Sequence, residues 1–257
     1  MNKTKIEWCD STWNPVTGCR HRCDYCYARR VAQRFGKEVP DFSGYPLRHK
    51  GAHMLDNKFD NNPYPFLFEP TFHAYRLKEP QHKKKPQTIF VCSMADLFGD
   101  WVPDEWIEEV FEACKKEPQH RYLFLTKNPK RYKSLIKDGK LPEKDNFWYG
   151  SSMPTPTTLF ASSDRHNMFV SIEPMMEKFP CLEGHPAEKV RWIILGAMTG
   201  PGSQKHQPKR EWIEAVVEIA QAQGTAIFMK DSLLPIVGEE NMLREYPWKE
   251  ANHDRVD

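Results

Sequence analysis

Three cysteines in one short stretch are the residues of this sequence best suited to chemistry. Cys19, Cys23 and Cys26 lie within eight residues, with three residues between the first pair and two between the second. This spacing lets one tight loop point three thiolates at a common centre, and thiolates are the usual ligands of iron–sulfur clusters and zinc. A closed zinc site uses four ligands, whereas a cluster held by three leaves one iron open. We expect that open iron to be the working part of the protein.

The stretch resembles the cluster motif of the radical S-adenosylmethionine (SAM) superfamily, both in its spacing and in Tyr25, the aromatic residue directly before the last cysteine. The resemblance implies that the three cysteines hold a [4Fe–4S] cluster and that SAM chelates the fourth iron through its amino and carboxylate groups. It also implies that an electron from the cluster cleaves SAM to methionine and a 5′-deoxyadenosyl radical, which abstracts hydrogen from a substrate. By the same resemblance, Tyr25 packs near the adenine.

Two other interpretations of the cysteine stretch stay open. A structural zinc site would need a fourth ligand, either Cys9 or His21. Cys9 lies ten residues before Cys19, which is wide for a zinc pair, and His21 sits inside the loop, where its ring reaches the same centre with difficulty. Chance clustering of cysteines in a buried loop is the third interpretation. A motif is only a hypothesis until its structural context agrees.

Composition places the chain among ordinary globular proteins. Its 257 residues suit one large α/β domain or two small ones, and its net charge of +2 gives no global electrostatic argument for nucleic acid. Seven cysteines, three of them in a ligand motif, favour a reducing compartment over a disulfide scaffold. No apolar run resembles a signal sequence or a membrane span. We therefore expect a cytoplasmic protein that does not associate with membranes.

Buried strands alternate with helices along most of the chain. The apolar runs that predict strands are residues 88–92, 122–125, 147–149, 168–172, 190–195 and 225–229, with a short strand candidate over residues 6–18. Amphipathic patterns predict helices over residues 28–35, 129–136 and 209–223 and another that begins near Asp104. This alternation indicates parallel β/α units. We predict an α/β fold, a partial or full (β/α) TIM-like barrel of the radical SAM type, as a single domain over residues 1–257.

Several local features of this fold are also predicted. An irregular insertion rich in aromatic residues and proline follows the first helix over residues 37–86, and an irregular polar tail covers residues 235–257. Gly36 ends the first helix, where glycine accepts the left-handed cap conformation, and Gly224 ends the helix over residues 209–223. Asp104 caps the second long helix, and residues 157–163 form a helical turn.

Polar side chains follow the predicted strands, at the edge where barrel enzymes carry their chemistry. Small or hydroxyl-bearing residues there also fit a simple role as turn formers. Charged groups directly after buried strands fit that role less well, because they need partners or a purpose. We therefore predict three catalytic residues, Lys127, Glu173 and Lys230.

The superfamily places a Gly-Gly-Glu-like segment after its second strand, where it meets the amino group of SAM. This sequence lacks that segment, and Ser93 and Asp96 in the corresponding place are expected to supply oxygen acceptors instead. The same positional comparison assigns Ser171 and Glu173 to the ribose or methionine portion of SAM. It assigns the backbone at Gly196 to the adenine.

A second resemblance covers almost the whole chain. The sequence is similar to the phage Gp37/Gp68-like family, a domain of unknown function. The segments that carry this similarity are residues 5–8, 14–15, 18–19, 93–98, 125–127, 171–174, 200–202 and 228–230. Phage association makes a nucleoside, nucleotide or nucleic acid the expected substrate, for modification or repair, and a small-molecule or peptide substrate stays open. An electron donor such as a flavodoxin or ferredoxin is the other expected partner, and the sequence does not indicate an oligomeric state.

The rival function is a non-enzymatic nucleic-acid-binding protein organised by zinc or by a structural cluster. A cluster-bearing protein that no longer cleaves SAM is a third possibility, which the missing Gly-Gly-Glu-like segment allows. Basic residues give limited guidance. Lys83-Lys84-Lys85 and the arginines near the cysteine loop suit either phosphate contacts or a solvated surface.

Overall fold

The structure is a computed structural model that describes residues 1–37, 51–58, 62–180, 184–200 and 202–249. The chain divides into two compact units, Met1–Trp148 and Tyr149–Asp257, and each is described by itself. Whether both units form one domain stays a prediction.

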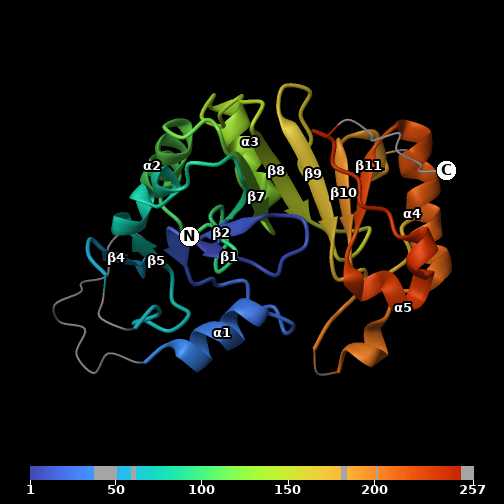
Figure 1. The fold of residues 1–257 in the computed structure, drawn as a ribbon, viewed down its shortest axis with the longest axis horizontal. Helices are drawn as coiled ribbons and strands as arrows, with labels where there is room; N and C mark the ends of the chain where they lie inside the picture. Colours follow the sequence, from blue (N-terminus) through green and yellow to red (C-terminus); the bar gives the residue numbers. More distant parts are fainter. Residues whose placement is uncertain (38–50, 59–61, 181–183, 201, 250–257) are drawn as a thin grey trace. The chain divides into compact units, whose positions relative to one another are not determined.

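The first unit contains neighbouring strands that form a sheet (Figure 1). Its strands lie in the order β1 (Asn2–Lys3), β2 (Ser11–Trp13), β6 (Thr88–Val91) and β7 (Arg121–Thr126). Strand β1 is antiparallel to β2, whereas the pairs β2–β6 and β6–β7 are parallel. The apolar side chains along β6 and β7 are buried except for the half-buried Leu125, which explains why continuous apolar runs mark these strands.

The strands of the second unit also pair in parallel. Strand β8 (Phe147–Ser152) begins in the first unit, and Met153 after it donates its backbone N–H to the oxygen of Ser171 in β9, at 2.8 Å. Strands β9 (Asn167–Ile172), β10 (Trp192–Leu195) and β11 (Ala226–Met229) pair in parallel in that order. The α/β fold is therefore confirmed, and the parallel pairing is compatible with a partial β/α barrel.

The α-helices are α1 (Tyr27–Phe35), α2 (Asp104–Lys115), α3 (Pro129–Lys137), α4 (Arg210–Gln223) and α5 (Leu234–Val237). Short 3₁₀ segments connect the elements: η2 (Ala74–Lys78), η3 (Pro80–His82), η4 (Pro186–Glu188), η5 (Ser203–His206), η6 (Asp231–Leu233) and η7 (Glu239–Asn241). The buried face of α2 packs on β7, since the rings of Phe111 and Phe124 lie 5.4 Å apart at a steep angle. No helix in the described ranges combines the length and apolar character needed to cross a membrane.

The helix ends correct two local predictions. Gly36 ends α1 in an extended conformation with φ −81°, not in the left-handed region. A Cβ at Gly36 would lie 2.5 Å from the oxygen of Ala32, so close backbone approach explains this glycine. Asp104 begins α2 without capping it, because the N-cap position is Pro103; the carboxylate of Asp104 forms an ion pair with Arg131. Gly224 ends α4, as predicted, and has φ +66°.

Residues 157–163 and the tail also differ from the predictions. No helix forms over residues 157–163, where a turn is closed by a 3.1 Å hydrogen bond from the Thr158 N–H to the Thr155 oxygen. The tail is more regular than predicted as far as residue 249. It contains helical segments, and the backbone of Arg244 forms an antiparallel β-bridge with Phe228 of β11. The rest of the tail, residues 250–257, lies outside the described residues.

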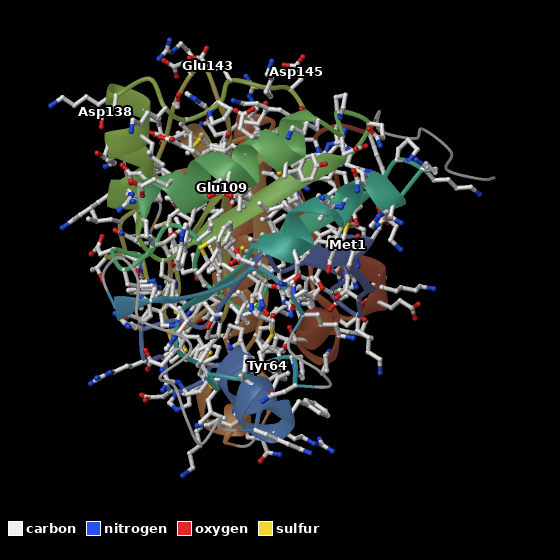
Figure 2. The ribbon with its side chains drawn as sticks, turned by 90° about the vertical axis from the view of Figure 1, so that its left-hand side faces the viewer. Met1, Tyr64, Glu109, Asp138, Glu143 and Asp145 are labelled. Atoms are coloured by element: carbon white, nitrogen blue, oxygen red, sulfur yellow. The ribbon has the colours of Figure 1, made fainter. Side chains whose placement is uncertain are left out.

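A small second sheet belongs to the first unit. Its strands lie in the order β3 (Val16–Thr17), β5 (Thr71–His73) and β4 (His53–Leu55), and two of them come from the insertion. Tyr64, labelled in Figure 2, packs with Phe68 on the cluster that includes Ala28 and Ala32 of helix α1. The insertion thus places apolar rings against the helix that follows the cysteines. Residues 38–50 and 59–61 of the insertion lie outside the described residues.

Candidate functional site

The cysteine loop leaves the second sheet at Gly18 and ends at helix α1. Gly18 has φ +83°, and its N–H donates to the oxygen of Met94 at 2.9 Å. A Cβ there would lie 2.2 Å from the backbone oxygen of Glu69, so the position requires glycine. At the other end, Cys26 is the N-cap of α1 and accepts a 3.4 Å hydrogen bond from the N–H of Arg29. Both ends of the loop are therefore fixed by backbone contacts.

The three motif cysteines are free and half-buried. Cys19 and Cys26 pack on the apolar cluster that contains Phe68 and Met94. Burial, together with the nearby Asp96, Cys23 and Cys26, raises the pKa of Cys19 to about 12. Burial also raises the pKa of Cys23, while the positive charge of Lys127 lowers it. Thiolates at this loop therefore need a compensating positive charge.

The three thiols fit the donor set of a cluster held by three cysteines, because they lie on one loop within electrostatic range of one another. In the described part of the chain, no three His, Cys, Asp or Glu side chains are grouped closely enough to hold a metal ion. Binding of a cluster therefore requires this loop to bring the three sulfur atoms closer together than they lie in the structure.

Tyr25 and Lys127 meet beside the cysteines. The Nζ of Lys127 donates a 3.1 Å hydrogen bond to the Tyr25 hydroxyl and lies 5.2 Å from the centre of its ring. Lys127 directly follows β7, so the end of that strand reaches the cysteine loop. The cation holds the ring and acts on the thiol of Cys23 from the same position.

Asp96 is a buried carboxylate that connects three segments. Its Oδ1 accepts hydrogen bonds from the hydroxyl of Thr126 at 2.7 Å and from the N–H of Phe98 at 3.0 Å. Its Oδ2 accepts from the ring Nε2 of His21 at 2.7 Å and from the N–H of Lys127 at 2.8 Å. Four donors satisfy the carboxylate, which thereby joins the cysteine loop to the end of β7.

Ser93 contacts the first residue of α1, directly after the cysteine loop. Its hydroxyl donates to the side-chain oxygen of Asn14 at 3.2 Å, and its backbone oxygen accepts from the hydroxyl of Tyr27 at 2.7 Å. Asn14 also accepts from the N–H of Met94 at 2.9 Å. The loop after β6 is thus tied both to the residue that follows β2 and to the first residue of α1.

The second unit brings together the remaining predicted residues. Lys230 forms a half-buried ion pair with Glu173, and a Cβ at Gly196 would lie 3.0 Å from Cγ of Glu173 and 3.2 Å from Cδ of Lys230. Glycine at position 196 therefore leaves room for the pair. Ser171 is buried in β9, two residues before Glu173. The peptide bond between Glu173 and Pro174 is cis.

The comparisons with known proteins give one family. A family model described as a protein of unknown function, DUF5131, matches residues 3–234. The chain belongs to this family. The match contains every predicted site residue of both units, so these residues lie inside the DUF5131 region. No curated protein and no solved structure matches the chain.

Two residues of this DUF5131 site were assigned other roles or none from the sequence. Asn14 carries part of the similarity to the phage family and received no role in the site from the sequence, yet its side chain holds the loop that carries Ser93. His21 was considered only as a zinc ligand, whereas its ring is hydrogen-bonded to Asp96. The signal available in the sequence was that both residues are polar and that each lies beside a strand end or a cysteine.

Proposed function

We propose that this DUF5131 protein is a radical SAM enzyme that modifies or repairs a nucleoside or nucleic acid. Cys19, Cys23 and Cys26 are the proposed ligands of a [4Fe–4S] cluster. The proposal rests on three free, half-buried thiols on one loop, close enough to affect one another electrostatically. When bound, the cluster would pass one electron, received from a flavodoxin or ferredoxin, to SAM, which breaks into methionine and a 5′-deoxyadenosyl radical that takes hydrogen from the substrate.

The first unit supplies groups that hold SAM in this proposal. Tyr25 packs near the adenine, and Lys127 fixes the orientation of its ring. Ser93 and Asp96 are the proposed acceptors for the amino group of SAM. Because Asp96 already accepts four hydrogen bonds, Ser93 is the better candidate for direct contact, and Asp96 positions the loop.

The second unit supplies the other proposed groups. Ser171 and Glu173 are assigned to the ribose or methionine portion of SAM, and the backbone at Gly196 to the adenine. Lys127, Glu173 and Lys230 are the proposed catalytic residues. The ion pair of Lys230 with Glu173 keeps a proton donor next to a proton acceptor, an arrangement that suits general acid–base chemistry.

Anaerobic reconstitution with iron and sulfide, followed by reduction and addition of SAM, tests the proposal. We expect 5′-deoxyadenosine by mass spectrometry from the wild type and none from Cys23→Ala. Cys9→Ala is the matched control, since Cys9 is also a half-buried cysteine outside any disulfide but lies outside the motif. A wild-type protein that forms no cluster and retains zinc would contradict the proposal.

The rival function is a zinc-organised nucleic-acid-binding protein. His21 is engaged with Asp96, which disfavours His21 as a fourth zinc ligand. This leaves Cys9 as the candidate. The Cys9→Ala control therefore also discriminates between the two functions, because loss of bound metal from that variant would favour zinc.

A further inference from the structure

A cavity of about 650 Å³ lies in the first unit, formed by two segments that are far apart in the sequence. One segment covers residues 3–11, which follow the Met1 labelled in Figure 2, and the other covers residues 83–87. Four of the lining residues are lysines: Lys3, Lys5, Lys83 and Lys85. The short basic run of the sequence is thus joined by the lysines at the start of the chain.

Backbone and side-chain hydrogen bonds fix the two segments against each other. The N–H of Asp10 donates to the oxygen of Thr88 at 2.9 Å, and the N–H of Thr88 donates to Oδ2 of Asp10 at 2.7 Å. The hydroxyl of Ser11 donates to the side-chain oxygen of Gln87 at 2.9 Å. Part of the cavity lining is therefore held in place where β2 and β6 begin to pair.

The charge of the lining is positive. Its four lysines stand against two carboxylates, Glu7 and Asp10, and Asp10 already accepts the N–H of Thr88. Within the described ranges, none of the four lysines forms an ion pair with a carboxylate. Like charges held around one cavity repel one another, and bound anions relieve that repulsion.

We propose that this cavity, the lysine cavity, binds the phosphate backbone of a nucleic acid. Ammonium groups act as point charges and contact phosphates without reading bases. The lining residues include no aromatic side chain on which a base would stack, so the cavity suits a backbone and not a base. Lysines from two segments offer several separate contacts, which suits a chain of phosphates better than one small anion. The inference deepens the nucleic-acid substrate class of the proposed function.

Fluorescence anisotropy with a labelled single-stranded DNA of about 20 nucleotides, which exceeds common site sizes, tests the inference. The combined variant K3Q/K5Q/K83Q/K85Q should bind at least about tenfold more weakly at low salt. The slope of log affinity against log salt should become shallower by about 3, because each phosphate neutralised on a single strand contributes about 0.7. The pair K83Q/K85Q should produce about half of that change.

The matched control is K116Q/K130Q/K133Q/K137Q, which removes the same charge from exposed lysines elsewhere in the first unit. This control should bind within about twofold of the wild type. Equal weakening in both combined variants would overturn the inference, as would a wild type that does not bind. If tripolyphosphate competes as effectively as unlabelled DNA, that result would also overturn the inference, in favour of a small-anion site. Binding is measured without SAM or iron, so its failure is distinct from a failure of the proposed chemistry.

Discussion

Lys127 Nζ donates a 3.1 Å hydrogen bond to the hydroxyl of Tyr25, which lies 102 residues earlier in the chain. The bond places a cation beside the cysteine loop, where its charge lowers the pKa of Cys23 against the effect of burial. A single lysine at the end of β7 therefore orients an aromatic ring and favours a thiolate.

Replacement of this lysine should slow alkylation of Cys23. In Lys127→Met the thiolate loses its nearby positive charge, so a smaller fraction of Cys23 is reactive at pH 8. Mass spectrometry of the iodoacetamide-modified peptide from metal-free protein measures the rate. Tyr25→Phe keeps the charge and should alkylate Cys23 at close to the wild-type rate. A faster rate in Lys127→Met would contradict this electrostatic account.

Gly18→Ala should be strongly destabilising, because two costs coincide at this position. The residue has φ +83°, and a Cβ there would meet the backbone oxygen of Glu69 at 2.2 Å. Gly139 has φ +66° with open space around it, so Gly139→Ala measures the cost of the conformation alone, about 1–2 kcal/mol. Urea unfolding should show a loss of more than about 3 kcal/mol for Gly18→Ala. Equal losses in the two variants would show that the backbone contact is unimportant.

The sequence predicts the strands well because their burial appears as continuous apolar runs. Residues 122–125 were predicted and Arg121–Thr126 is observed. Strand β8 extends past the predicted residue 149 to Ser152, because buried serines at 151 and 152 look like turn residues in a sequence. Gly36 was assigned to the correct helix end for the wrong reason, since it is required by close backbone contacts, to Ala32 in its own helix and to Tyr64 in another segment.

The candidate site was predicted only as a set of residue types. Nothing in local periodicity indicates that His21 reaches Asp96 or that Asn14 holds the loop of Ser93. Such polar pairs depend on where loops meet in space, and they carry no repeating signal. Lys127, Glu173 and Lys230 were selected for their position after buried strands, and each has a specific polar partner. Their catalytic role stays a prediction.

The ion pair of Glu173 and Lys230 should show strong coupling in a double-mutant cycle. Glu173→Gln leaves the half-buried ammonium of Lys230 without its counter-ion and should cost about 1–3 kcal/mol of stability. The further change Lys230→Met should recover part of that loss, because it removes the unpaired charge. Thermal unfolding of the two single variants and the double variant gives the coupling energy. Additive losses would mean that the pair contributes nothing to stability.

Stability should fall as the pH decreases below about 6.5. Burial lowers the pKa of His73 well below its ordinary value of 6.5, so the unfolded chain binds a proton at a higher pH than the folded protein. The stabilisation is therefore complete above pH 6.5 and is lost as the pH falls toward the folded pKa. One pH unit below 6.5, a single histidine accounts for at most about 1.4 kcal/mol. Urea unfolding of His73→Gln should show a weaker pH dependence than the wild type, whereas His206→Gln, at an exposed position, should match it.

Asp96→Asn should loosen the cysteine loop while most of the first unit stays folded. Each carboxylate oxygen of Asp96 accepts two of the four hydrogen bonds. An asparagine replaces one of these oxygens by an NH₂ group, which cannot accept, so two donors lose their acceptor. We expect the free energy of unfolding to fall by about 1–3 kcal/mol, as for a buried polar group left unsatisfied.

Hydrogen exchange in Asp96→Asn should become faster over residues 19–26 and 126–128, the segments that Asp96 connects. His21→Ala removes only the contact with the loop and should accelerate exchange over residues 19–26 alone. Unchanged exchange at these segments in Asp96→Asn would mean that the carboxylate does not hold the loop to β7.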